Sequence, residues 1–189
     1  MARPLSEKKR DALLEAASDL IAQLGTGAST AKIAKAAGVS EGTLFTYFPS
    51  KDDLLNDLFV EIEGELAETI LAPYPIEASA RDRLFIVWSR LIEWGLNHSR
   101  ARKALRQLKV SDRVTAQSRE RCHAMFLDSR SMVEQCLAGH AAPERIAFYI
   151  DTILFQLADI TMNAIVAKPK EREAIQQAGF DLFWKGSAA

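Results

Sequence analysis

The sequence has few residues that cross-link or interrupt a chain: its 189 residues include two cysteines, six prolines and nine glycines. So few cysteines exclude a disulfide-rich scaffold, and so little proline and glycine excludes a collagen-like or low-complexity chain. The longest stretch without a charged residue, 20–31, is much shorter than the ~20 apolar residues that cross a bilayer. Acidic residues recur through the first twenty positions, where a signal peptide would need an uncharged core. We therefore expect no membrane span, no export signal and a cytoplasmic location.

Signals for β-strands are also nearly absent, because no long run alternates apolar and polar residues. Hydrophobic residues make up 48% and charged residues 26% of the chain, which is enough apolar material for a folded core. The apolar periodicity predicts an all-α protein of about nine helices. They are expected at 6–24, between Ser29 and Gly38, from Ser40 to Phe48, and at 50–71, 79–97, 99–110, 114–138, 143–166 and 169–185.

The two cysteines, Cys122 and Cys136, fall in the predicted helix 114–138. At about 1.5 Å of rise per residue their positions would lie roughly 21 Å apart, which is too far for a disulfide. We predict two free thiols, buried as structural residues.

The charge changes sign near Lys51, although the net charge is only −1. Residues 1–51 hold seven Lys or Arg against five Asp or Glu, whereas 52–71 hold seven acidic residues and no basic one. A DNA-binding module followed by an acidic element pointing elsewhere would give this pattern, and so would a solvated acidic helix face. Both interpretations stay open.

The segment 29–48 has the spacing of a helix-turn-helix. Two very short helices joined by Ala37-Gly38-Val39 bury little surface by themselves, so one is expected to brace and the other to project. In the second helix Val39, Leu44 and Phe48 can face the brace. The outer face would then consist of small and hydrogen-bonding residues, which suit the major groove of DNA: Glu41, Gly42, Thr43, Thr46 and Tyr47.

This stretch resembles the DNA-binding domain of the TetR family of bacterial transcriptional regulators. The resemblance covers residues 6–58 and rests on a dozen positions in order: Ser29, Ile33-Ala34, Ala37-Gly38-Val39-Ser40, Gly42-Thr43-Leu44-Phe45, Tyr47-Phe48, Lys51-Asp52 and Leu54. It implies a DNA-binding domain at 1–50, a connecting helix at 51–71 and an effector-binding and dimerisation domain at 72–189. Pro73 and Pro75 are consistent with a boundary near that point.

The resemblance also implies roles for single residues. Ser29 and Thr30 would lie at a phosphate, Glu41, Gly42, Thr43 and Thr46 would face bases, and Tyr47 and Lys51 would hold the DNA backbone. Phe45 departs from the family, which usually has Tyr there, so a phosphate hydrogen bond worth about 0.5–1.5 kcal/mol would be lost. Glu41 could instead be a solvated residue of the first helical turn.

Two other motifs suggest an enzyme. Gly38-Val39-Ser40-Glu41-Gly42 matches the nucleophile elbow of α/β-hydrolases, but that motif needs a preceding strand, and Ser40 is better explained as a helix cap. Glu120 and His123 match half of a di-iron site, but neither other histidine has a partner Glu. We therefore predict no catalytic residues, no metal and no cofactor. A helical enzyme and a protein interaction module remain the alternatives to a regulator.

The predicted helix 143–166 is apolar on nearly every side, so a partner should cover part of it. One stripe holds Ile146, Tyr149, Ile150, Ile153, Leu157, Ile160 and Ala164, and Phe148, Phe155, Met162 and Val166 fall towards another. Together with the last helix it predicts a homodimer, which the resemblance also implies. Two recognition helices related by a two-fold axis would bind an approximately palindromic operator.

A small-molecule effector is expected among the central helices, and its release of the operator would make the protein a repressor. The candidate ligand-binding residues are inward by spacing or polar within the apolar helix: Phe85, Trp88, Ile92, Cys122, Phe126, Ser129, Gln156 and Asp159. Few charges point inward, which favours an apolar or amphipathic ligand. The basic residues at 100–106 could hold an anion or form a solvated face.

Overall fold

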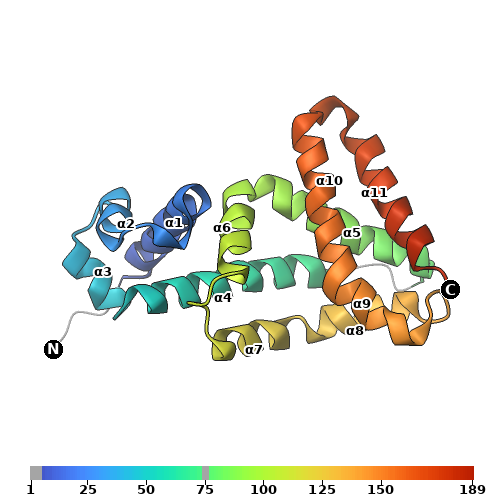
Figure 1. The fold of residues 1–189 in the computed structure, drawn as a ribbon, viewed down its shortest axis with the longest axis horizontal. Helices are drawn as coiled ribbons and strands as arrows, with labels where there is room; N and C mark the ends of the chain where they lie inside the picture. Colours follow the sequence, from blue (N-terminus) through green and yellow to red (C-terminus); the bar gives the residue numbers. More distant parts are fainter. Residues whose placement is uncertain (1–5, 74–76) are drawn as a thin grey trace. The chain divides into compact units, whose positions relative to one another are not determined.

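The computed structural model describes residues 6–73 and 77–189, and its regular structure is helical, with no strand in those ranges (Figure 1). The all-α prediction is confirmed. The α-helices are α1 (Glu7–Leu24), α2 (Thr30–Ala36), α3 (Glu41–Tyr47), α4 (Lys51–Leu71), α5 (Ala80–Asn97), α6 (Ser99–Lys109), α7 (Ala116–Met125), α8 (Leu127–Leu137), α9 (Ile146–Phe148), α10 (Phe155–Ala167) and α11 (Arg172–Ser187).

The chain divides into two compact units that do not follow one another in sequence. Unit 1 holds the described residues up to Glu65 together with His98–Ala124, and unit 2 holds Leu66–Asn97 and Met125–Ala189. Helix α4 therefore has its first fifteen residues, 51–65, in unit 1. The three consecutive domains inferred from the sequence stay a prediction about function.

Unit 1 is built on α1, which packs against α2 and α6. Its buried face consists of Leu13, Leu14, Ala17 and Ile21. At the C-terminal end of the helix Leu24 is 53% exposed. The helix ends at Gly25, whose φ of +70° is the left-handed conformation that glycine adopts without strain, and so the chain turns before Leu24 can reach the core.

Serine caps start the three helices that follow. The Ser29 Oγ accepts from the Lys32 N–H, and the Ser40 Oγ accepts from the Thr43 N–H. The Ser50 Oγ accepts from the Asp53 N–H and donates to the Asp53 carboxylate. These local signals place the starts of α2, α3 and α4.

The acidic residues of α4 are paired with bases from other parts of unit 1. Arg10 of α1 bridges Asp57 and Glu61 at 3.1 Å each. The buried Glu63 lies 2.9 Å from Lys109 of α6. The acidic cluster after Lys51 is therefore a surface for binding α1 and α6 as well as a solvated face.

Unit 2 packs α5 against α8, α10 and α11. Trp88 of α5 and Phe180 of α11 are fully buried, and α10 and α11 form an antiparallel pair (Figure 1). Gly179 allows the close approach, because a Cβ there would clash with Thr161 Oγ1 and would lie 2.9 Å from the Trp88 ring. Glycine at 179 therefore sets the spacing of the three helices.

The helix predicted at 114–138 is two helices. Helix α7 ends at Met125, and Phe126, with φ −93° and ψ 0°, precedes α8. Neither glycine nor proline marks this break, so the pattern of residues did not reveal it. Both cysteines are free and buried, as predicted, but they lie on different helices.

The segment Pro143–Ala167 is continuous but changes its winding. A 3-10 turn and α9 lead into a π-helical stretch, Tyr149–Leu154, before α10 begins. By length and composition alone the segment could cross a membrane, although core helices pass the same test. Asp151 within it pairs with Arg130 of α8, which fits a helix of unit 2.

The extra residue of the π-helical stretch rotates the buried stripe away from the predicted one. The buried residues are Ile150, Leu154, Ala158, Thr161, Met162 and Ile165. Ile160, predicted with the first stripe, is 63% exposed.

The predicted break after α4 lies at Ala72-Pro73-Tyr74-Pro75, of which Tyr74 and Pro75 are outside the described residues. Arg90 of α5 donates to the carbonyls of Ile70, Ala72 and Pro73. A side chain from a later helix thus satisfies backbone acceptors at the end of α4.

Candidate nucleic-acid interface

Helices α2 and α3 form the helix-turn-helix that the sequence predicts. Each has seven residues, and the turn between them passes through Gly38 with φ +70°. The Val39 N–H donates to the Ala34 carbonyl at 2.9 Å and closes the turn. The left-handed residue reverses the chain within three positions, so α3 crosses over α2.

Helix α3 has one buried and one exposed side. Leu44 and Phe48 are fully buried, together with Ile33 of α2. Val39, predicted with them, is only half-buried. On the other side Glu41, Gly42, Phe45 and Thr46 are exposed, and Thr43 and Tyr47 are half-buried. Phe45, at 43% exposure, is an aromatic ring on an otherwise small and polar face.

The polar side chains of this face already have partners within the protein. Thr30 Oγ1 donates to Glu41 Oε1 at 2.6 Å, which joins the starts of α2 and α3. Thr43 Oγ1 lies 2.8 Å from Ser40 Oγ, and Thr46 Oγ1 donates to the Gly42 carbonyl at 3.0 Å. Hydroxyl and carboxylate oxygens have further acceptor capacity, so these residues are oriented and can still accept from DNA bases.

Tyr47 connects the end of α3 to the start of α1. Its hydroxyl accepts from the Ser6 N–H at 2.9 Å. Ser6 is the N-cap residue of α1, and its side chain makes no cap hydrogen bond. The phenolic proton of Tyr47 is still able to donate, which is what a phosphate contact needs.

Lys51 begins α4, three residues after Phe48, and is half-buried. Burial lowers the pKa of its amine, Arg113 lowers it further, and Asp52 raises it. A basic side chain at the start of an acidic helix therefore lies beside a second cation that comes from a distant part of the sequence.

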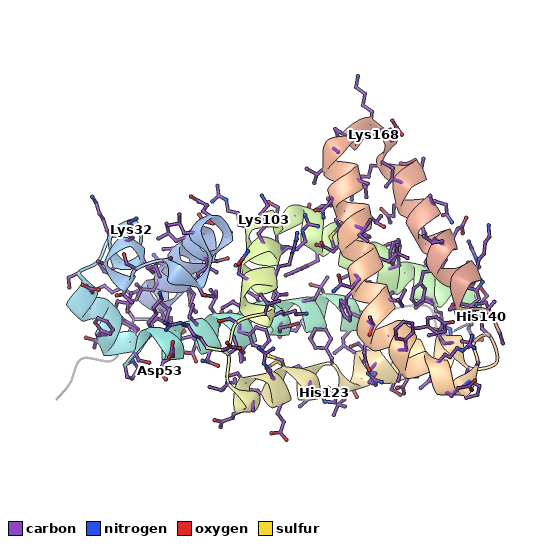
Figure 2. The ribbon with its side chains drawn as sticks, in the orientation of Figure 1. Lys32, Asp53, Lys103, His123, His140 and Lys168 are labelled. Atoms are coloured by element: carbon purple, nitrogen blue, oxygen red, sulfur yellow. The ribbon has the colours of Figure 1, made fainter. Side chains whose placement is uncertain are left out.

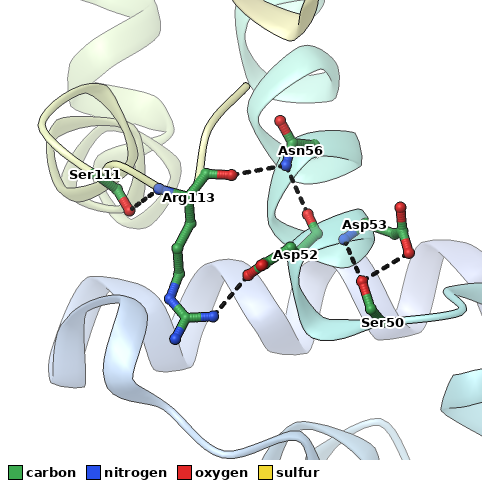
Figure 3. A network of polar contacts seen from close by, with 6 residues as sticks. All are labelled: Ser50, Asp52, Asp53, Asn56, Ser111 and Arg113. Carbon is green, nitrogen blue, oxygen red and sulfur yellow. Dashed lines mark hydrogen bonds and ion pairs between the residues drawn. The ribbon is translucent and has the colours of Figure 1, made fainter. Parts of the chain in front are cut away.

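That second cation belongs to a polar network that the sequence did not reveal (Figure 3). Arg113, in the loop between α6 and α7, lies 2.6 Å from Asp52, and Asn56 donates to the Arg113 carbonyl at 2.9 Å. These partners are about sixty positions apart in the chain, and no local pattern relates them. Only the packing of the loop on α4 brings them together.

Other basic residues border the motif. Lys32 is exposed and points away from α2, and Lys35 lies exposed in its last turn (Figure 2). Neither was among the predicted contacts, although both stand in the predicted first helix of the motif. Of the basic residues at 100–106, Arg100 is paired with Asp19 at 2.6 Å and Arg102 is buried.

The predicted ligand-binding residues are distributed over both units. Cys122 lies in unit 1, where burial raises the pKa of its thiol to about 11. In unit 2, Trp88 donates to the Gln176 carbonyl at 3.1 Å, and both Trp88 and Phe85 pack on Phe180.

The remaining candidates lie in unit 2 and differ in burial. Ile92 and Ser129 are buried, and Ser129 donates to the carbonyl of Phe126, whose ring packs edge-on against Phe155. Gln156 is exposed, and Asp159 is half-buried and accepts from Asn163 at 3.3 Å. The assignment of these eight residues to a ligand stays a prediction.

The competing motifs have structural explanations. Ser40 is the cap of α3, and no strand precedes it in the described part of the chain. His123 is exposed on α7 (Figure 2). Within residues 6–73 and 77–189 no group of three or more His, Cys, Asp or Glu is arranged to hold a metal ion.

The segment that carries this geometry, residues 13–58, matches the model of the tetR family of bacterial regulatory proteins. These residues therefore carry the DNA-binding domain of the tetR family. This match supports the function of a DNA-binding transcriptional regulator. A tetR family transcription regulator from Shewanella sp. PV-4 has a similar structure, with a TM-score of 0.84 and 28% identity, over 96% of this chain and 98% of that one.

Two curated relatives extend the comparison. The fatty acid metabolism regulator protein of Bacillus subtilis is 38% identical over 79 residues, which are 41% of this chain and 41% of the relative. The nucleoid occlusion factor SlmA of Vibrio cholerae is 26% identical over 93% of this chain and 92% of its own. The first match thus spans less than half of that relative.

Proposed function

We propose that the protein is a repressor that binds an approximately palindromic operator as a homodimer and leaves it when a small-molecule effector binds. The observation that carries this proposal is the outer face of α3, where exposed Glu41, Gly42 and Thr46 stand on a helix braced by buried Leu44 and Phe48. A short helix supported in this way can enter the major groove.

The contacts follow from the two ends of the motif. Ser29 and Thr30 at the start of α2 would hold phosphates on one side of the groove. Tyr47 at the end of α3 and Lys51 at the start of α4 would hold them on the other side. Glu41, Gly42, Thr43 and Thr46 would face base edges between them. Phe45 would offer an apolar contact, for which a thymine methyl is suitable.

A second copy of the chain would cover the outer side of α10 and α11. Large apolar residues are exposed on these two helices, Ile160, Val166 and Leu182 at 63% each, and Phe148 of α9 is 53% exposed. Apolar residues gathered on neighbouring helices favour a protein partner over water. A two-fold dimer would present two α3 helices to sites separated by about 34 Å, one turn of DNA.

The effector is proposed to be apolar or amphipathic and to bind in unit 2. Three of the candidate residues in this unit are buried and uncharged: Trp88, Ile92 and Ser129. The name of the Bacillus subtilis relative, a fatty acid metabolism regulator, makes long-chain acyl compounds the first class to test. Such an effector would act by binding more tightly to the conformation that cannot hold DNA.

The test begins with duplexes that the full chain selects from a random-sequence pool. We expect an inverted repeat, one dimer per duplex in sedimentation, and affinity that falls steeply with salt. Palmitoyl-CoA or palmitate should then raise the melting temperature of the protein and release the duplex. A protein that selects no duplex would refute the DNA-binding part, and an asymmetric site bound by a monomer would refute the dimer.

A second candidate function rests on the similarity to SlmA over nearly the whole chain. A nucleoid occlusion factor would occupy many chromosomal sites, whereas a metabolic repressor would occupy a few promoters. Genome-wide mapping of bound sites in cells decides between them, since occupancy confined to a few promoters excludes the first function.

A further inference from the structure

Asn56 joins α4 to the loop between α6 and α7 with its full hydrogen-bonding capacity. Its Nδ2 donates to the Asp52 carbonyl at 2.7 Å and to the Arg113 carbonyl at 2.9 Å, while its Oδ1 accepts from the Thr115 N–H at 2.9 Å and from Thr115 Oγ1 at 3.2 Å. An asparagine that makes both donor and both acceptor contacts is held in a single orientation. The residue therefore fixes the loop to the second turn of α4 (Figure 3).

The loop, residues 110–115, is itself well supported. Val114 is buried, and the Arg113 N–H donates to Ser111 Oγ at 3.2 Å. Arg119 of α7 donates to the carbonyls of Lys109 and Ser111 at 3.1 Å each. A braced loop can hold the helix that it contacts, which a freely moving loop could not.

The held part of α4 adjoins the DNA-binding motif. Only Pro49 and Ser50 separate Phe48 from Lys51, the first residue of α4. Arg113 lies 2.6 Å from Asp52, the next residue of the helix. The direction of the first turn of α4 therefore decides where the Lys51 side chain lies relative to α3.

We propose that the loop 110–115 positions Lys51 for its phosphate contact, with Asn56 as the positioning residue and the Arg113–Asp52 ion pair as its support. Asn56 itself does not touch DNA. The inference rests on the proposed role of Lys51. It adds that residues far along the sequence from the helix-turn-helix set the strength of DNA binding.

The experiment is a double-mutant cycle with Asn56→Ala and Lys51→Ala in the full chain. It measures the affinity for a duplex that the wild-type protein selects, and how that affinity depends on salt. Each phosphate contact contributes about 0.9 to the slope of log K against log salt concentration. We expect Lys51→Ala to lower the slope by about one unit and the affinity by about tenfold. Asn56→Ala should do nearly the same, and the double variant should bind no more than about twofold more weakly than either single variant.

Two variants separate positioning from stability and charge. Asn56→Asp keeps the size of the side chain and the acceptor for Thr115, but it loses the donor to the Arg113 carbonyl. This variant replaces Asn56→Ala in the experiment if Asn56→Ala does not fold. Arg100→Gln is the control for the charge lost in Lys51→Ala, since it also removes one positive charge from unit 1, and it breaks the 2.6 Å pair with Asp19 without touching the loop. It should leave the salt slope unchanged.

A wild-type slope in folded Asn56→Ala and Asn56→Asp would overturn the proposal. So would full additivity with Lys51→Ala, because a residue that acts only on stability leaves the Lys51 contact intact. If Lys51→Ala changes neither slope nor affinity, the proposed role of Lys51 fails and the inference fails with it. Lack of any duplex binding by the wild-type protein would instead refute the proposed function.

Discussion

The outer face of α3 and the outer face of α10 and α11 are both exposed, yet they differ in chemistry. On α3 the exposed side chains are short and mostly polar, and those of Glu41 and Thr46 already hydrogen-bond within the protein. On α10 and α11 the exposed side chains include Ile160 and Leu182, which have no polar group to offer to water.

The difference indicates two kinds of partner. Oriented donors and acceptors suit the base edges of DNA, whose pattern can be read only by groups held in place. Exposed aliphatic side chains gain free energy from any surface that excludes water, and a second copy of the same helices is the nearest such surface. The outer face of α3 would supply specificity for the DNA sequence, and the outer face of α10 and α11 would supply the dimer interface.

The largest effect is expected from a charge placed on the apolar face. Leu182→Asp should prevent dimerisation, because a carboxylate would be buried in the interface, and the loss of one half-site should weaken binding to the selected duplex by about a hundredfold or more. Sedimentation and fluorescence anisotropy measure the two effects.

Gln135→Asp is the control for this change, since it adds the same charge to an exposed position on α8. It should leave both the oligomeric state and the affinity unchanged. A Leu182→Asp protein that still forms dimers and binds normally would show that α11 is not part of the interface.

The next effect concerns the support beneath the apolar face. Gly179→Ala should destabilise the protein by about 1–3 kcal/mol, because its Cβ would meet Thr161 and Trp88. Gly186→Ala is the matched control on the same helix, where nothing lies within 4 Å of the added Cβ. That variant should be neutral or slightly more stable, since alanine favours helix. Equal melting curves for the two variants would contradict the close packing.

A smaller effect is expected on the polar face. Thr43→Ser keeps the hydroxyl near Ser40 and removes the methyl group, whereas Thr43→Val keeps the methyl group and removes the hydroxyl. If Thr43 reads a thymine, Thr43→Ser should reduce discrimination at one base pair by about 1 kcal/mol, and Thr43→Val should not. Binding to a set of duplexes with single base-pair substitutions measures the difference. If the wild-type protein, Thr43→Ser and Thr43→Val prefer the same base pairs, Thr43 does not contact a base.

The smallest effect is expected from ionisation of the buried Cys122 thiol inside unit 1. Because burial raises the pKa of the Cys122 thiol to about 11, the folded protein should react very slowly with alkylating agents at pH 8. The unfolded chain, with a thiol pKa near its usual value of about 8.5, loses its proton first as the pH rises. Folding stability should therefore decrease as the pH rises from about 9 towards 11. Rapid alkylation of native protein at pH 8 would contradict the burial.

The parts of the fold that could be predicted are those that short sequences determine. The serine caps at 29, 40 and 50 and the left-handed glycines at 25 and 38 act on residues within four positions. The family resemblance covers the same region, and the residues proposed to face DNA are therefore a prediction from sequence alone.

The rest depends on contacts between distant residues. Nothing near Phe126 indicates a helix break, and the π-helical stretch 149–154 moves the buried stripe by one residue, which periodicity alone cannot anticipate. The contact of Asn56 with the 110–115 loop joins residues 57 and 59 positions apart. Such features arise from packing, and the sequence pattern carries no trace of them.

The hydrogen bond between Thr30 and Glu41 leaves most of the carboxylate available to a base. Thr30 occupies one lone-pair site of Oε1 at 2.6 Å, and the remaining sites on both oxygens can accept from a base amino group. Because the bond already restricts the rotation of the Glu41 side chain, less conformational entropy is lost when a cytosine amino group binds. Glu41 would thus meet the operator preordered, and a base that offers only acceptors there would be disfavoured.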